Sequence, residues 1–160
     1  MKEIGIGVGL LGIGCGIWLA VSGGFNLGEA TAKRGFDYET ASLEDRAQWL
    51  QVQAKPMRKM LSRSLPSGRG PAAVNMKVKD VRVDARRRSI TAIIGISGMY
   101  QLDKRAVPAA KKSLTETICP SYANSELGKN KVQILHSFVG NKGREELSLV
   151  ISPIVCRKYM

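Results

Sequence analysis

The chain has 160 residues, with 25 lysines and arginines against 13 aspartates and glutamates, and a formal net charge of +12. This length leaves room for one small domain beside one membrane segment, which excludes a large multidomain enzyme. A single histidine without a Cys-x-x-C pair also disfavours a zinc site.

Residues 4–21 contain neither a charged side chain nor a proline, and they predict a membrane helix. Within this run, small residues recur at spacings of three and four, so that they form one stripe on a helix. Such a stripe lets a second helix approach the backbone closely. We therefore expect a single transmembrane anchor over residues 1–27 that packs against a partner helix through Gly5, Gly9, Gly12 and Gly16.

Three processing signals compete with a retained anchor. Ala20-Val21-Ser22 has small residues at the right spacing for a secretory signal peptide to be cleaved after Ser22. A lipoprotein box before Cys15 would need a leucine where Gly12 stands, and the pilin-like Gly24-Phe25 lacks the long apolar helix that should follow it. Glycine costs about 1 kcal/mol per residue inside a helix, so the glycine stripe needs a packing role and favours the retained anchor.

Residues 28–73 predict a juxtamembrane connector and one amphipathic helix. Ser42 can cap the helix, with Asp45 returning the hydrogen bond. Pro56 is expected to kink or divide the helix near Lys55. A flexible linker over residues 66–73 follows. The apolar stripe of the helix comprises Leu43, Ala47, Leu50, Ala54, Met57 and Leu61.

Residues 74–160 predict a ββαββ domain. Alternating apolar residues indicate strands at 74–83, with a bulge near Asp80, and at 89–97. A helix begins near Val107 and ends at Cys119-Pro120, and a loop covers 120–131. Strands at 132–139 and 147–156 are joined by the turn 140–143. The predicted fold class is α+β, an antiparallel sheet with helices on one face in the order α-ββαββ.

Cys119 and Cys156 are the only cysteines of the predicted soluble part, and together they predict one disulfide. Disulfides persist in oxidising compartments. We therefore expect a bacterial inner-membrane protein whose soluble domain lies in the periplasm. Cys15 lies in the membrane segment. The alternative is two unrelated thiols in a cytosolic domain.

The layout resembles that of small exported bacterial domains of helix-ββαββ order closed by a disulfide. The pieces that carry this resemblance are Leu65-Pro66, Val78 to Ile96, Ile118-Cys119, Val132 to Phe138 and Ile151 to Cys156. It implies an exported, disulfide-closed domain and implies no activity.

No catalytic group stands out. His136 alternates with apolar residues in a predicted strand, where a partly exposed structural position is expected. Glu145 and Glu146 are adjacent and point to opposite faces, so they form no acid–base pair. No glycine-rich phosphate loop is present. We therefore expect neither an enzyme nor a cofactor, a metal or a small-molecule substrate.

The basic charge is the remaining functional signal, because such a field attracts anionic surfaces. In the periplasm these would be an acidic protein surface or anionic lipid. Nucleic acid is disfavoured, since Tyr100 is the nearest aromatic residue. The predicted basic patch comprises Arg58, Lys59, Arg63, Arg86, Arg87, Arg88, Lys111 and Lys112.

The sequence thus predicts a non-enzymatic accessory or assembly subunit of an inner-membrane complex, with other transmembrane subunits as partners. It would cross the membrane once and expose its C-terminal domain to the periplasm. Two alternatives stay open. The first is a soluble periplasmic binding protein released by signal cleavage. The second is a cytosol-facing basic domain that binds nucleic acid or anionic lipid.

Overall fold

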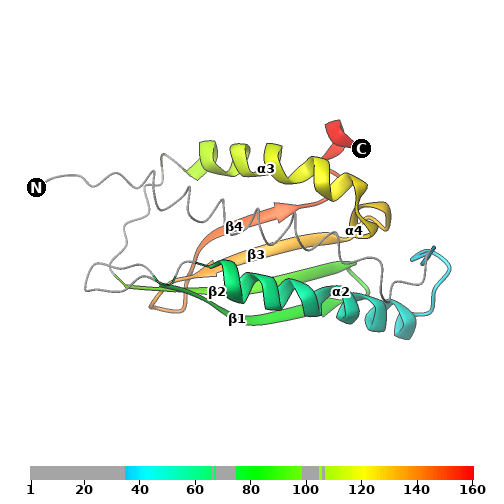
Figure 1. The fold of residues 1–160 in the computed structure, drawn as a ribbon, viewed down its shortest axis with the longest axis horizontal. Helices are drawn as coiled ribbons and strands as arrows, with labels where there is room; N and C mark the ends of the chain where they lie inside the picture. The colour runs from blue at the N-terminus through cyan, green and yellow to red at the C-terminus, as the bar shows by residue number, and fades with distance from the viewer. Residues whose placement is uncertain (1–34, 66, 68–74, 99–104, 106) are drawn as a thin grey trace, which may run out of the picture.

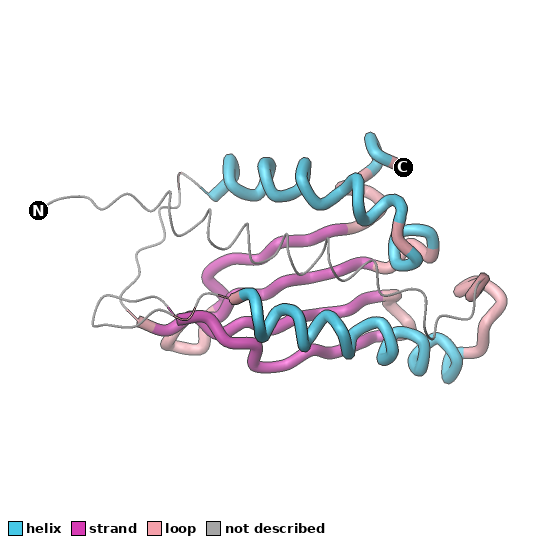
Figure 2. Tube along the Cα trace, in the orientation of Figure 1, coloured by secondary structure: helices cyan, strands magenta, loops and turns pink. Residues whose placement is uncertain are grey.

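The computed structural model describes residues 35–65, 67, 75–98, 105 and 107–160, which form helices packed on a sheet (Figures 1 and 2). In chain order the elements are α2 (Leu43–Ser64), β1 (Asn75–Asp84), β2 (Ser89–Ser97), α3 (Val107–Asn124), α4 (Glu126–Lys129), β3 (Gln133–Val139), β4 (Glu145–Ile151) and the 3₁₀ turn η1 (Arg157–Tyr159). This mixture confirms the α+β class.

The predicted anchor, 1–27, with its stripe of Gly5, Gly9, Gly12 and Gly16, lies outside the described residues. Within the described ranges, no helix is long and apolar enough to cross a membrane.

The sheet is mixed, and the prediction of an antiparallel sheet was wrong at its centre. In the described ranges the strand order is β1-β2-β3-β4. The outer pairs are antiparallel, whereas β2 and β3 run parallel, with Ile90 opposite Ile134 and Ile94 opposite Phe138. The reason is that α3 lies between β2 and β3 in the chain. A helix of this length carries the chain back along the sheet, so that the next strand begins at the same end.

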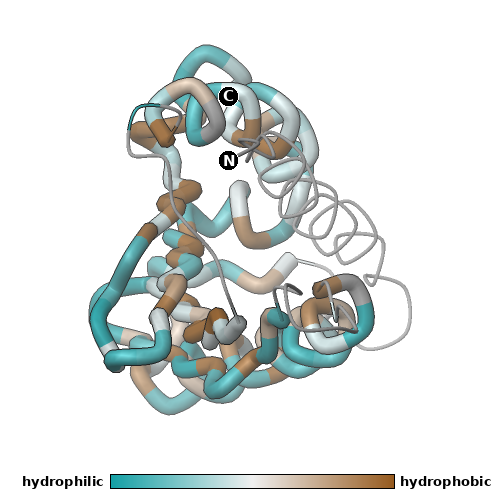
Figure 3. Tube along the Cα trace, turned by 90° about the vertical axis from the view of Figure 1, so that its left-hand side faces the viewer, coloured by the Kyte–Doolittle hydropathy of each residue, from teal (hydrophilic) through white to brown (hydrophobic). Residues whose placement is uncertain are grey.

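One face of the sheet forms the core. Cross-strand partners share a face, and the row Val78, Ile94, Phe138 and Leu147 is buried in all four strands. Helix α2 packs on β1 and β2, and α3 packs on β4. Figure 3, which views the domain from one end, shows hydrophobic and hydrophilic residues interspersed along the described chain. The predicted apolar face of the second strand, Ile90, Ala92, Ile94 and Ile96, is confirmed as buried.

Both long helices continue through a proline, which excludes the predicted division of the first helix at Pro56 and the predicted end of the second at Pro120. Helix α2 runs unbroken across Pro56, and α3 runs across Pro120 to Asn124, where a loop was expected. Each proline removes one helical hydrogen bond. Buried residues on both sides of it, such as Ala54 and Met57 around Pro56, hold the helix against the core and offset that loss. The expected Ser42 cap is confirmed, with Asp45 N donating to Ser42 Oγ at 3.1 Å.

The two edge strands differ from their predictions to different degrees. The bulge near Asp80 is confirmed, since the register of β1 shifts between Val78 and Asp80. Strand β4 ends at Ile151 rather than at Cys156, because Pro153 lies in a turn that leaves the sheet. That turn brings Cys156 over α3.

The disulfide between Cys119 and Cys156 is present, with Cα atoms 5.2 Å apart, and both cysteines are fully buried. It joins the buried face of α3 to the segment after β4. Consequently the crossover helix and the last strand are tied together by a covalent bond.

Replacing both cysteines, as Cys119→Ala with Cys156→Ala, is expected to lower the free energy of unfolding by roughly 4 kcal/mol, because the bridge closes a long loop in the unfolded chain. Urea unfolding of the full chain in mild detergent measures this loss. Cys15→Ala is the control and should change nothing. Unfolding of the double variant at the same urea concentration as the oxidised wild type would contradict the prediction.

Candidate functional site

The structure divides the predicted basic patch between two opposite edges of the sheet. Arg58, Lys59 and Arg63 lie on α2, which packs on the β1 edge, while Lys111 and Lys112 lie on α3, which packs on the β4 edge (Figure 1). The third group, Arg86, Arg87 and Arg88, occupies the turn between β1 and β2.

A larger group of basic residues, on α2 and β1, lies at the β1 edge of the sheet, and we call it the basic edge. Its side chains come from α2 and from β1, and all of them are exposed. Asp80, on β1, is an acid within this group. It accepts a hydrogen bond from Arg82 at 2.7 Å, and this bond lowers the pKa of its carboxyl group, with a smaller contribution from Arg58. The residues of the basic edge are Lys55, Arg58, Lys59, Arg63, Lys77, Lys79 and Arg82.

Arg88 has a structural partner. Its guanidinium binds the carboxylate of Glu39 with two hydrogen bonds, of 2.8 and 2.6 Å. This pairing lowers the pKa of Glu39 and raises that of Arg88. Arg88 also lies 4.8 Å from the centre of the Tyr38 ring, and Arg46 lies 5.1 Å from it. Of the three arginines in the turn, Arg86 and Arg87 are the exposed ones.

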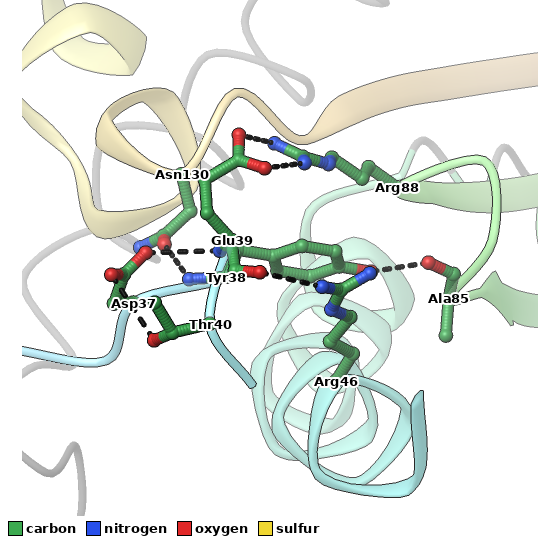
Figure 4. A network of polar contacts seen from close by, with 8 residues as sticks. All are labelled: Asp37, Tyr38, Glu39, Thr40, Arg46, Ala85, Arg88 and Asn130. Carbon is green, nitrogen blue, oxygen red and sulfur yellow. Dashed lines mark hydrogen bonds and ion pairs between the residues drawn. The ribbon is translucent and has the colours of Figure 1, made fainter. Parts of the chain in front are cut away.

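Tyr38 is the centre of this contact network, which Figure 4 shows. Only 1% of Tyr38 is exposed. Its hydroxyl donates to the carbonyl of Ala85 at 2.8 Å, and its backbone N–H donates to Asn130 Oδ1 at 3.1 Å. Burial raises the pKa of its hydroxyl. Beside it, the rings of Phe36 and Trp49 stack with centroids 4.8 Å apart. The segment 36–39 is thereby fixed to the β1–β2 turn and to the loop after α4.

His136 is buried, so the expectation of a partly exposed position was wrong. It shares the helix-facing side of β3 with Ile134 and Phe138, between Ala92 of β2 and Leu149 of β4. It is 1% exposed, and neither ring nitrogen has a hydrogen-bond partner. Burial lowers its pKa to about 4, so the ring is neutral at pH 7. A buried imidazole without a polar neighbour can neither bind a substrate from solvent nor be oriented as a base.

No other group in the described ranges suggests chemistry. They contain no cluster of three or more histidine, cysteine, aspartate or glutamate residues that could hold a metal ion. Glu145 accepts a hydrogen bond from Ser137 at 2.5 Å, whereas Glu146 has no ion pair within those ranges. The candidate functional features of the described residues are therefore exposed charged and apolar side chains.

Comparison of the chain with models of protein families, with curated proteins and with solved structures finds no match. The candidate site therefore depends on the geometry of this chain alone.

The sequence predicted a juxtamembrane connector before the helix that Ser42 caps, and it did not reveal that residues 36–39 pack against the domain. The local signal was the alternation of Phe36 and Tyr38 with acidic Asp37 and Glu39, which is typical of a segment with one buried side. Its partners, Ala85 and Asn130, lie 47 and 92 residues away in the chain, so no local pattern could identify them.

Acidification is expected to destabilise the domain through His136. The unfolded histidine binds a proton below its ordinary pKa of 6.5, whereas the folded one does so only near pH 4. Protonation therefore favours the unfolded chain as pH falls between these values, by about 3 kcal/mol in total. His136→Leu should remove this component. Urea unfolding of both chains at pH 7, 5 and 4 gives the two slopes, and equal slopes would contradict the assignment.

Proposed function

We propose that this chain is a non-enzymatic subunit of a membrane complex in the bacterial inner membrane, crossing the bilayer once and exposing its domain to the periplasm. The periplasmic location is supported by one observation, the disulfide between Cys119 and Cys156. Such a bond persists outside the reducing cytosol. The uncharged run 4–21 supports the anchor.

The anchor supplies the first contact with the complex. Its stripe of Gly5, Gly9, Gly12 and Gly16 packs against the transmembrane helix of another subunit, where close backbone approach replaces side-chain bulk. This role gives the glycines a reason that compensates for their low helix propensity.

The basic edge supplies the second contact, with an acidic surface of the same complex. Arg58, Lys59 and Arg63 carry no ion pair within the described residues, and neither do Lys77 and Lys79. Charges of one sign along an exposed edge steer an oppositely charged partner toward it. The lysines of β1 also keep this edge from pairing with a strand of another sheet. An electrostatic contact that does not add a strand suits such an edge.

Replacing Gly9 and Gly12 together by leucine is expected to abolish co-purification of transmembrane partners, because two leucines fill the stripe. The matched control is Gly7→Leu with Gly14→Leu, which adds the same bulk on the opposite side of the helix. Pull-down from mild detergent with mass spectrometry measures both. Intact mass of the purified chain shows whether residues 1–22 are retained. Their loss would favour the cleaved, soluble alternative, and unchanged partners in the stripe variant would refute the packing role.

Reversing charge on the basic edge, as Arg58→Glu with Lys59→Glu, is expected to slow binding of the isolated partner by at least about tenfold at low salt. Lys111→Glu with Lys112→Glu is the control of equal charge on the other sheet edge. Association rates at low and high salt distinguish the two. A larger effect of the control pair would place the docking surface on α3 instead.

A further inference from the structure

The first described residues of the chain lie at one end of the sheet together with several loops, and we call this end the anchor-proximal end. It consists of residues 35–43, 84–88, 126–133 and 152–157. The strand register places these segments together, since Val83, Ile90, Ile134 and Ile151 are successive partners across the sheet. The contacts of Tyr38 attach the segment 35–43 to the same end (Figure 4).

Exposed apolar side chains concentrate at this end. Within the described ranges, five large hydrophobic residues are exposed, and three of them, Leu43, Ile154 and Val155, lie in the segments of this end. Ile154 is 82% exposed and Val155 41%, in a turn that Cys156 holds against α3 through the disulfide. Leu43, 46% exposed, begins α2 next to Tyr38, and the C-terminal Met160 lies at the same end in Figure 1. Exposed apolar side chains that gather in one place mark an interaction surface.

The charges at this end favour anions. Most of its carboxylates already have partners in the chain. Glu39 binds Arg88, Glu126 binds Lys129, and Asp84 accepts from the backbone of Arg86 and Arg87. Asp37 binds the backbone of Glu39.

The cations that remain are exposed. Within the described residues Arg86, Lys131 and Arg157 have no ion pair. Glu44 and Asp45 are exposed acids in the first turn of α2, where the helix dipole favours a negative charge.

The length of the connector determines what faces this end. Between the predicted anchor, which ends at Leu27, and the packed Phe36 there are eight residues, which span at most about 28 Å when fully extended. The segment from Phe36 to Glu39 is fixed to the domain and adds no reach. The connector therefore keeps the anchor-proximal end within about 28 Å of the predicted anchor. The opposite end of the ten-residue strand β1 lies about 33 Å farther along the strand, so the anchor-proximal end is the one that the connector brings toward the bilayer.

We propose that the anchor-proximal end docks on the surface of the bilayer itself. Arg86, Lys131 and Arg157 contact anionic headgroups, while Ile154, Val155 and Leu43 enter the interfacial region. Exposed apolar residues combined with basic residues bind anionic membranes in this way. The inference depends on the proposed membrane anchor, and it adds a second contact with the same bilayer.

The test uses the full chain with Trp18→Phe, reconstituted in vesicles whose phospholipid tails are brominated and quench tryptophan on contact. Ile154→Trp is the reporter, and Lys142→Trp, in the exposed turn at the opposite end of the sheet, is the matched control. Trp49 is buried, and its signal is subtracted with the parent chain. We expect Ile154→Trp to lose fluorescence in brominated vesicles that contain phosphatidylglycerol, and Lys142→Trp to lose none.

The charges are tested by adding Arg86→Glu and Lys131→Glu to the Ile154→Trp reporter, which should abolish the quenching, as should vesicles of phosphatidylcholine alone. Equal quenching of the two tryptophan positions would overturn the docking. Quenching of Ile154→Trp that survives both charge reversal and neutral lipid would overturn the role of the cations. Flotation with vesicles of phosphatidylcholine alone separates these results from failure of the anchor, because a chain without a working anchor would not float with them.

Discussion

The parallel pairing of β2 with β3 determines which loops of the domain meet. Because both strands begin at the same end of the sheet, the β1–β2 turn and the loop after α4 lie side by side there. Tyr38 can then bond to Ala85 and Asn130 at once. Had β3 run the other way, its first residue would lie at the opposite end, about 23 Å away for a strand of seven residues. The Tyr38 network, the disulfide position and the cluster of exposed apolar residues all depend on this one strand direction.

The two proposed surfaces face different directions. The basic edge runs along α2 and β1, parallel to the strands, whereas the anchor-proximal end is perpendicular to them. A partner on the basic edge and the bilayer at the end can thus be bound at the same time without competing for residues. Arg88 lies within the anchor-proximal end but contributes to neither proposed contact, because its guanidinium binds Glu39 and lies over the ring of Tyr38.

Local rules predicted the elements well and their assembly less well. The Ser42 cap, the bulge near Asp80 and the apolar face of β2 follow from patterns a few residues long, and the disulfide follows from there being only two cysteines beyond the anchor. The direction of β3 depends on α3, which carries the chain back along the sheet. Helix continuity across Pro56 and Pro120 depends on packing against the core, which helix propensities do not include. His136 is a local pattern that was misjudged, since its neighbours Ile134 and Phe138 already placed it on the apolar side of the strand. The exposure of Ile154 arises because the chain leaves the sheet at Ile151, which composition alone does not reveal.

The fixed attachment of residues 36–39 also has a consequence for distance. If the anchor-proximal end lies on the bilayer as proposed, the strands would rise away from the membrane. The ten residues of β1 then measure a height of about 33 Å. The turn 140–144, with Lys142 and Arg144, occupies the top of that column. The domain would serve as a spacer of set length, so that a partner loop bound along the basic edge is held at a defined level above the lipid.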